Sequence, residues 1–379
     1  MTSRERLLTL LAGDVPDCVP VMPDISNMVP ARLTGKPFWD LYLYNNPPIW
    51  HAYINAAKYF DLDSLMDGYV PLVFAEEIGT GGLPWERFIV DRTPARLVTQ
   101  ASYSENGTRV WAPTVDVYGV ADPPWHGVEP ATVDLPDTPT DWEPLEGVKP
   151  VDIGPEGFAQ AKQMLGDQGL MGAFVAFTCA LGSEQDVFRY YDNPDKHEEW
   201  AQQRVEAAEA RFERIMAMPV KPDFICVGGS GTLIWQTVEM FRRLALPAVK
   251  RAIDLATEAG FPTHVHSCGP ERELVKVMVE ETDLTIIDPL EPPPMGDCDL
   301  AQLKRLYGDK IILKGNLHTT DVMLRGSAQD VVAASKKAID DAGAGGGFVL
   351  STGDQCGRDT PFENLRAIVD TARTYGRYG

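Results

Sequence analysis

The sequence predicts a (β/α)8 barrel in a single domain spanning residues 1–379, with an early insertion at about 79–150. Short strands alternate with helices eight times along the chain, and most of the strands after residue 170 are apolar throughout. Apolar strands between helices are typical of a parallel sheet that is covered on both sides, and eight such units favour a closed barrel. A doubly wound open sheet is the alternative. No Gly-x-Gly-x-x-Gly segment follows a strand, so the usual dinucleotide-binding signal is absent from the sequence.

The first part of the chain is expected to hold an amphipathic opening helix, two short strands and the insertion. The strand candidates are Cys18–Asp24 and Leu62–Asp67, and helical spacing marks Ile49–Phe60 between them. From about residue 86 to 121 the alternating pattern predicts antiparallel hairpins with a turn at Asn106-Gly107. A stretch rich in Pro, Asp and Glu follows to about residue 155 and is interpreted as a surface loop.

A regular rhythm of helices and strands begins near residue 154. The expected helices are 156–165, one ending before Pro194, 195–218, more than one within 238–259, then 271–281, 300–307, 328–341 and a last one opening at 360. The expected strands are 170–177, 223–228, the segment around His264, 284–288, 310–316 and 348–353. Thr360 and Glu363 form a predicted capping box with proline between them, and Phe362, Leu365, Ile368 and Val369 fall on one face of the last helix.

Composition restricts the partners of this chain. Its 55 acidic and 34 basic residues give a formal charge of −21, which argues against nucleic acid and anionic membranes as general partners. No apolar run approaches the roughly 20 residues of a membrane span, and the N-terminus does not resemble a signal peptide. Six cysteines in a chain of 379 residues do not make a disulfide framework, so we expect a reduced, cytoplasmic setting.

Polar side chains follow the last four predicted strands, where barrel enzymes carry their active sites. They are His266 and Cys268, then Asp288 and Glu291, then Asn316 and His318, and finally Asp354 and Cys356. His266, Cys268 and Cys356 supply one nitrogen and two sulfur donors, a set of three with one position left open, which is the usual mark of catalytic zinc. The candidate catalytic residues are Asp288, Asn316 and Asp354.

Less specific interpretations remain open for the same residues. His266, Cys268 and Cys356 could line a polar pocket as reduced thiols and an imidazole without metal, and the three candidate catalytic residues could satisfy backbone groups at the barrel rim. His264 lies deeper in its strand and is expected to be a buried, hydrogen-bonded support. A structural zinc would need a fourth protein ligand; the candidates are His264, Glu76, Glu77 and Glu291. Cys18, Cys179 and Cys226 are expected to be small core residues, and Cys298 to be incidental.

Three segments carry a resemblance to a known family. They are His266-Ser-Cys-Gly, Lys314-Gly-Asn-Leu, and Gly353-Asp-Gln-Cys-Gly-Arg-Asp-Thr-Pro. Together they resemble the uroporphyrinogen decarboxylase superfamily, and more narrowly its branch of zinc-containing, cobalamin-dependent methyltransferases. The resemblance implies the barrel and a zinc ion held by His266, Cys268 and Cys356. Where the decarboxylases carry an Arg-rich signature, residues 22–32 contain the single Arg32, so a multiply anionic porphyrinogen is disfavoured.

The resemblance implies methyl transfer between a small methylated molecule and a corrinoid. The small molecule is a methyl ether such as a methoxylated aromatic, which would make the reaction an O-demethylation, or a thiol acceptor. No Asp-x-His-x-x-Gly segment is present, so the corrinoid is expected on a separate partner protein. Zinc can hold a thiol as thiolate or polarise an ether oxygen, and two thiolate ligands favour the first role. A metal-free decarboxylase and a non-catalytic protein with structural zinc are the alternatives.

Overall fold

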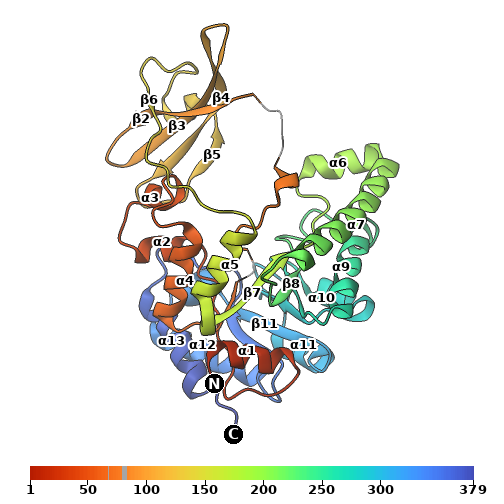
Figure 1. Cartoon of the computed structure of the whole chain (residues 1–379). Coiled ribbons are helices and arrows are strands. Elements are labelled where there is room, and N and C mark those ends of the chain that lie inside the picture. Colours follow the sequence, from red (N-terminus) through yellow and green to blue (C-terminus); the bar gives the residue numbers. More distant parts are fainter. Residues whose placement is uncertain (67, 79–82) are drawn as a thin grey trace. The chain divides into compact units, whose positions relative to one another are not determined.

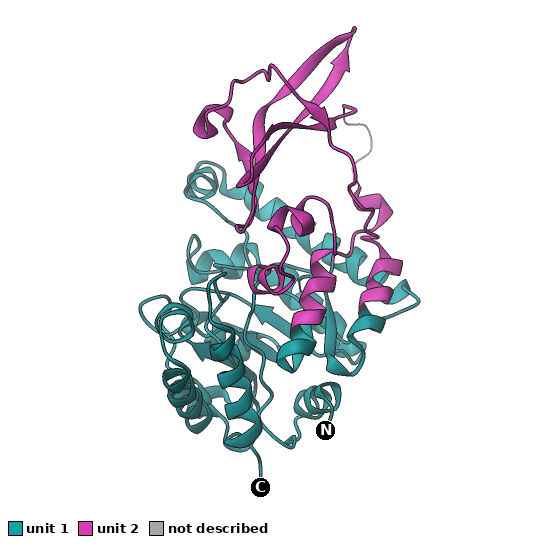
Figure 2. Cartoon of the chain, turned by 90° about the vertical axis from the view of Figure 1, so that its left-hand side faces the viewer, with its two compact units in different colours: residues 1–26, 57–70, 162–379 teal, residues 27–56, 71–161 magenta. Residues whose placement is uncertain are grey.

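The computed structural model describes residues 1–66, 68–78 and 83–379 (Figure 1). The chain divides into two compact units (Figure 2). Unit 1 comprises residues 1–26, 57–70 and 162–379, and unit 2 comprises residues 27–56 and 71–161. The insertion expected at about 79–150 falls within unit 2, and its residues 79–82 lie outside the described ones. A single domain with an insertion stays a prediction.

Unit 1 is built on a sheet of seven strands that are parallel to their neighbours and follow one another in chain order. The strands are β1 (Ser64–Met66), β7 (Gly169–Phe174), β8 (Phe224–Cys226), β9 (Thr263–His266), β10 (Ile286–Asp288), β11 (Ile312–Leu317) and β12 (Phe348–Thr352). Each of them lies in a segment that was predicted as a strand; the described part of Leu62–Asp67 ends at Met66. The predicted (β/α)8 class is confirmed.

The segment Pro20–Met22 occupies the eighth position of this sheet. On one side the Leu350 N–H donates to the Pro20 carbonyl, and the Met22 N–H donates to the Leu350 carbonyl, both at 2.9 Å. On the other side the Asp63 N–H donates to the Val21 carbonyl at 2.9 Å. The segment therefore joins β12 to the residue that precedes β1 and closes the ring of strands.

The predicted strand Cys18–Asp24 is only partly formed. It contributes two isolated bridges, Cys18 with Arg377 and Val21 with Leu350, instead of a regular strand. Pro20 and Pro23 lack the N–H that a ladder requires, which explains why pairing is confined to the residues around Val21.

The helices of unit 1 follow the predicted rhythm. They are α1 (Ser3–Leu11), α6 (Glu184–Asp192), α7 (Pro194–Ala217), α8 (Val238–Leu244), α9 (Leu246–Glu258), α10 (Arg272–Glu281), α11 (Leu300–Tyr307), α12 (Ala328–Ala342) and α13 (Phe362–Thr374). Helices α4 (Ile49–Phe60) and α5 (Pro155–Leu165) each begin in unit 2 and end in unit 1. Across the described residues, no helix combines the length and the apolar character needed to cross a membrane.

The capping box predicted for the last helix is wrong. Helix α13 starts at Phe362, its N-cap position falls on Pro361, and no side chain makes a cap hydrogen bond there. Proline has no side-chain acceptor, so the helix begins without the predicted reciprocal bonds. Of the four residues predicted to share one face, Leu365, Ile368 and Val369 are buried and Phe362 is half-buried.

Helix α1 anchors the N-terminal ends of the strands. Its Leu7 and Leu10 join the apolar cluster inside the sheet, with members from six strands and the closing segment: Met22, Leu65, Leu170, Phe224, Cys226, Ile286, Ile312 and Val349. The Arg4 guanidinium from the same helix makes two bonds to the Asp223 carboxylate, at 2.6 and 3.1 Å, and one to the carbonyl of Gly169 at the start of β7. Hydrophobic packing and ion pairing thus fix the helix against β7 and β8.

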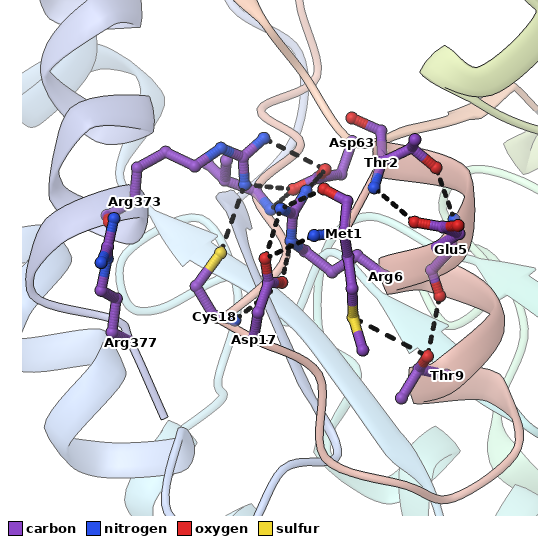
Figure 3. Close-up of polar contacts among 12 residues, drawn as sticks. Met1, Thr2, Glu5, Arg6, Thr9, Asp17, Cys18, Asp63, Arg373 and Arg377 are labelled. Carbon is purple, nitrogen blue, oxygen red and sulfur yellow. Dashed lines mark hydrogen bonds and ion pairs between the residues drawn. The ribbon is translucent and has the colours of Figure 1, made fainter. Parts of the chain in front are cut away.

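A buried carboxylate ties the two ends of unit 1 together at this end of the strands. Asp63 is 0% exposed and receives the Arg6 guanidinium from α1 at 2.6 Å and the Arg373 guanidinium from α13 at 2.7 Å (Figure 3). It also accepts the N–H of Val21 at 2.8 Å. Asp17 adds a second carboxylate to Arg6 at 2.7 Å.

Unit 2 contains a five-stranded antiparallel sheet in the order β5-β4-β3-β2-β6. Its elements are α2 (Met28–Leu33), α3 (Phe38–Tyr42), η1 (Ala75–Glu77), β2 (Glu86–Arg92), β3 (Arg96–Glu105), β4 (Thr108–Gly119), β5 (Trp125–Val128), η2 (Pro130–Val133) and β6 (Glu143–Pro144). The predicted turn is confirmed: Asn106 and Gly107 link β3 to β4 with φ of 49° and 80°, the left-handed pair that a tight hairpin requires.

Candidate functional site

Strand β9 presents its two histidines at different depths. The His264 side chain is 1% exposed, whereas the His266 side chain, at the carboxyl end of the strand, is 17% exposed. Gly228 packs against this end so closely that a Cβ at that position would lie 2.3 Å from the His266 backbone nitrogen. Glycine is therefore required where the loop after β8 passes the site.

Asp288 at the end of β10 is the centre of a buried polar cluster. Its Oδ1 lies 2.7 Å from His264 Nε2 and 3.5 Å from His266 Nδ1, and its other oxygen forms an ion pair with the Lys314 ammonium of β11. Burial alone would raise the pKa of Asp288, but the charges of Lys314 and the two histidines outweigh it and hold this pKa well below its usual range. Asp288 is thus the fixed anion of the cluster.

His266 lies between two carboxylates. Its Nδ1 faces Asp288, and its Nε2 is 3.8 Å from Oδ1 of Asp354, which follows β12. A carboxylate held ionised beside Nδ1 favours the tautomer with the proton on Nδ1, so Nε2 is assigned as the nitrogen with a lone pair. Metal-binding histidines are oriented in the same way by a carboxylate on their second nitrogen.

The two candidate thiol ligands differ in exposure. Cys268 follows β9 and is partly exposed, whereas Cys356 is 0% exposed. Burial, with the charges of Asp24 and Asp354, raises the pKa of the Cys356 thiol to about 12, against hydrogen bonds from two threonines. The Cys356 N–H donates to the carbonyl of Asp24 at 2.8 Å, which fixes the loop after β12 to the closing segment.

The structure brings His266 together with Asp288 and Asp354, but it does not assemble the predicted trio. Over residues 1–66, 68–78 and 83–379, no three His, Cys, Asp or Glu side chains form a group that could hold a metal ion. The donor set itself suits zinc, because it offers two sulfurs and one imidazole nitrogen whose ring is oriented by a buried carboxylate. Zinc binding by His266, Cys268 and Cys356 stays a prediction.

The other strand-end residues are engaged with the backbone. Asn316 donates from Nδ2 to the Leu290 carbonyl at 2.9 Å, as the less specific interpretation of this residue requires. Glu291 accepts the Gly269 N–H at 2.5 Å and is 4% exposed; burial raises its pKa, and the charge of Asp354 adds to the shift. His318 Nδ1 accepts the N–H groups of Thr320 and Asp321 and caps the π-helical turn Thr319–Leu324. Glu76 and Glu77 belong to η1 of unit 2.

Sequence reasoning missed several residues near the site. The candidate site residues did not include Lys314, although a lysine after Ile311-Ile-Leu in an apolar strand indicates a buried partner. Asp24 accepts the Tyr69 hydroxyl at 2.9 Å and the Ser26 N–H at 2.8 Å; burial raises its pKa against the charges of His266 and Lys314.

The prediction that Cys179 is a core residue is wrong. Its thiol is partly exposed and donates to the Ser230 carbonyl at 2.9 Å, and burial and the charge of Cys268 raise its pKa. The thiol therefore lies in the segment after β7, which ends at Phe174 and thus earlier than predicted, and contacts the loop after β8. Cys18 and Cys226 are buried, as predicted, and so is Cys298.

Glu271 is a buried acid beneath this cluster. It is 0% exposed, and its Oε2 accepts the Leu290 N–H at 2.6 Å. Burial raises the pKa of Glu271 well above its usual value, and the charge of Asp288 raises it further. The folded protein therefore holds this proton to a higher pH than the unfolded chain does.

We expect Glu271→Gln to become more stable relative to the wild type as pH rises. The unfolded chain releases the Glu271 proton near a pKa of about 4.3, so the wild type loses stability above that pH, by up to about 1.4 kcal/mol per pH unit, until the folded group also ionises. Glutamine does not titrate and avoids this loss. Urea unfolding at pH 5 and pH 8 measures the difference, with exposed Glu273→Gln as the control. If the free energies of unfolding of Glu271→Gln and the wild type differed by the same amount at both pH values, the raised pKa of Glu271 would be contradicted.

Residues 228–375 match the family model described as "Uroporphyrinogen decarboxylase (URO-D)", so the resemblance predicted from the sequence is confirmed. The chain is also similar to "Methylcobamide:CoM methyltransferase MtbA" of Methanosarcina mazei, with 31% identity over 139 residues, and of Methanosarcina acetivorans, with 29% identity over 137 residues. Each match covers 36% of this chain and 37% of the relative, so the chain spans little more than a third of these curated relatives.

The whole chain shares its fold with a solved structure, a "methyltransferase from Methanosarcina mazei". The two superpose with a TM-score of 0.61 over 99% of each chain, at 19% sequence identity. At 19% sequence identity this similarity supports the fold alone, and the shared fold agrees with the barrel described above.

Proposed function

From a chain whose residues 228–375 match the uroporphyrinogen decarboxylase family, we propose a zinc-dependent methyltransferase that works with a corrinoid carried by a partner protein. Its small substrate is a thiol acceptor or a methyl ether such as a methoxylated aromatic. The similarity to two methylcobamide methyltransferases supports the transferase class. Zinc dependence, the corrinoid partner and the substrate are the parts of the proposal that go beyond these similarities.

The observation that carries the proposal is the orientation of His266. The side chain ends β9 two residues before Cys268, with Asp288 on Nδ1 and Nε2 directed toward the loop that contains Asp354 and Cys356. His266 ends β9, Cys268 follows it and Cys356 follows β12, and in a barrel the carboxyl ends of all strands lie on the same side although these two strands are not adjacent. The arrangement orients the His266 ring with a buried carboxylate on one nitrogen, as in metal-binding histidines.

His266, Cys268 and Cys356 would hold the metal in this proposal. When bound, zinc supplies a Lewis acid that keeps a substrate thiol ionised at neutral pH or polarises an ether oxygen. Asp288 holds the His266 ring and its Nδ1 proton in place, and Lys314 and His264 hold Asp288 ionised. The chain thereby fixes its donor before any substrate arrives, which lowers the cost of reorganisation.

The proposed reaction is a displacement at a methyl carbon. A lone pair of the acceptor forms the new bond to carbon, and the bond to the donor breaks with both electrons remaining on the donor. The corrinoid, when docked, supplies the cobalt that gives up or receives the methyl group. The task of this chain is to hold the small substrate in line and to stabilise the charge on its sulfur or oxygen.

Metal content tests the site. We expect near-stoichiometric zinc in the wild type and its loss in both Cys268→Ala and Cys356→Ala, because a soft sulfur donor is removed in each. Cys298→Ala is the matched control, since Cys298 is a buried thiol outside the donor set. Zinc is measured by atomic emission after exhaustive buffer exchange, and thermal melts verify folding. Full zinc retention in Cys268→Ala or Cys356→Ala would remove that residue from the site.

Methyl transfer tests the reaction. Methylcobalamin with a panel of thiols examines the thiol direction, and cob(I)alamin with a panel of methoxylated aromatics examines O-demethylation. We expect turnover in one direction, dependent on zinc. Decarboxylation of a porphyrinogen without methyl transfer would identify the metal-free lyase instead.

A further inference from the structure

We propose that an aromatic face on helices α6 and α7 is the surface on which the corrinoid-carrying partner protein docks. The face consists of Phe188 and Tyr191 of α6 and Trp200 of α7. This inference rests on the proposed function, since that function requires a partner that brings the corrinoid. It adds the place and the chemistry of the contact, which the proposed function leaves open.

Helix α6 is an addition to the barrel pattern. One helix is enough to connect a barrel strand to the next, and α7 already makes that connection between β7 and β8. Helix α6 lies between the end of β7 at Phe174 and the start of α7 at Pro194. Because the helix that follows a strand starts on the side where that strand ends, α6 belongs to the side of the barrel that carries His266 and Asp288.

Helix α6 is apolar on two faces. Its inner face holds Tyr190, which is 5% exposed and packs with Leu181 and with Met240 of α8. Its outer face holds Phe188 and Tyr191, one turn apart, which are 60% and 68% exposed. A surface helix ordinarily presents polar residues to water on the side away from the core. The second apolar face is therefore a surface that the packing of unit 1 leaves exposed.

The aromatic face continues from α6 onto the adjacent helix α7 (Figure 1). Tyr190 contacts the ring of Tyr191 on one side and that of His197 on the other, with centroids 5.4 and 5.6 Å apart. His197 in turn contacts Trp200, which is 38% exposed, at 4.8 Å. Since an aromatic side chain has about 150–250 Å² of surface, the exposed parts of the face add up to about 300 Å². A contiguous apolar patch of that size is often an interaction site.

Polar contacts hold α6 in place. The Ser183 hydroxyl caps its first turn by accepting the Asp186 N–H at 3.2 Å. The Arg204 guanidinium of α7 donates to the Ala180 carbonyl, shortly before α6, at 3.3 Å. Together with the buried Tyr190, these contacts fix the helix, so the aromatic face is formed before a partner arrives. A preformed surface loses little conformational entropy on binding.

The charge around the aromatic face indicates the kind of partner. Residues 184–200 contain six acidic and two basic side chains. Glu184, Asp192, Asp195 and Glu199 are exposed, and none of them forms an ion pair within the described part of the chain. Basic groups around an apolar centre on the partner would complement them. A second copy of this chain would bring the same carboxylates and a charge of −21, so like charges oppose self-association through this face.

Affinity for a corrinoid protein tests the docking surface. The probe is a corrinoid protein purified from the source organism and identified by its bound cobalamin. Isothermal titration calorimetry at low and high salt compares the wild type with Phe188→Ser, Tyr191→Ser and Asp192→Lys. Asp192 is the last residue of α6, where a lysine is compatible with the helix. Leu306→Ser is the control, since Leu306 is 55% exposed on α11.

We expect Phe188→Ser and Tyr191→Ser to weaken binding about tenfold or more, and Leu306→Ser to bind like the wild type. Asp192→Lys should weaken binding at low salt and much less at high salt, because ions screen its charge. Turnover with free methylcobalamin should be the same in the wild type and in every variant, because the free cofactor does not use the docking surface. That turnover also verifies that each variant is folded.

Unchanged affinity of Phe188→Ser and Tyr191→Ser for the corrinoid protein would overturn the inference while leaving turnover with free methylcobalamin intact. A wild-type dimer in sedimentation that Phe188→Ser dissociates would also overturn it, since a second copy would then be the occupant of the face. Absence of turnover with free methylcobalamin in the wild type would overturn the proposed function, and the inference with it.

Discussion

Replacing Lys314 by methionine is expected to lower the free energy of unfolding by about 3–5 kcal/mol at neutral pH. Lys314 is 4% exposed and pairs with Asp288, which is 2% exposed. Methionine fills a similar volume but removes the lysine cation and leaves the buried carboxylate with only the two imidazoles beside it. Urea unfolding at pH 7 measures the loss. Lys310→Met, at an exposed lysine just before β11, is the control and should change stability by less than about 0.5 kcal/mol.

The effect of Lys314→Met should shrink in acid. The lowered pKa of Asp288 means that its contribution is complete above the usual pKa of aspartate, about 3.9, and is lost as pH falls toward the lower folded value. Without Lys314 the pKa of Asp288 rises, so the variant takes up the proton first and is relieved of the buried charge. The difference from the wild type should therefore be smaller at pH 4 than at pH 7. Equal differences would show that the lysine acts through packing alone.

Replacing Asp63 by asparagine is also expected to lower the free energy of unfolding by about 3–5 kcal/mol. The carboxylate is fully buried and neutralises Arg6 and Arg373, while accepting the N–H of the closing segment (Figure 3). Asparagine can still accept one hydrogen bond but leaves the two cations without their shared anion. The loss is measured as the change in urea midpoint at constant slope.

Asp61→Asn tests whether burial of the carboxylate determines the loss of stability, because Asp61 contacts the same Arg373 as Asp63 does. Asp61 contacts Arg373 at 3.3 Å, but its side chain is 67% exposed. An exposed ion pair contributes less than about 1 kcal/mol, so this variant should remain close to the wild type. Comparable losses in Asp61→Asn and Asp63→Asn would contradict the explanation based on burial.

The barrel was predictable because strands that are buried on both faces leave a continuous apolar signal. The segments before Asp288 and around Leu350 show this apolar signal, and the helices between them show helical spacing of apolar residues. The helix 300–307 was predicted with its observed bounds. The closing segment and the cap of the last helix were less predictable. Prolines interrupt the closing segment, and a proline occupies the N-cap position of the last helix. Because proline has no N–H and no side-chain acceptor, neither the predicted strand nor the predicted capping box forms in full.

The site was predictable only as a set of strand ends. That rule brought His266, Asp288 and Asp354 together, because parallel strands place their carboxyl ends on one side. The pairing of Lys314 with Asp288 depends on the register of β10 against β11, which the residue pattern of either strand does not contain. The position of Asp24 near His266 and Lys314 depends on the closing segment. That segment pairs with residues more than 300 positions later in the chain.

The pairing of Val21 with Leu350 has a consequence for synthesis. A ribosome produces the Val21 segment long before it produces β12, so the ring of strands cannot close until β12 has emerged. Contacts between such distant residues slow folding, and apolar strand edges remain accessible in the meantime. The early segment must therefore wait for its last partner, and the apolar cluster that contains Leu7 and Leu10 lacks Val349 until then. Nascent chains stalled before residue 350 should bind holdase chaperones more strongly than released full-length protein.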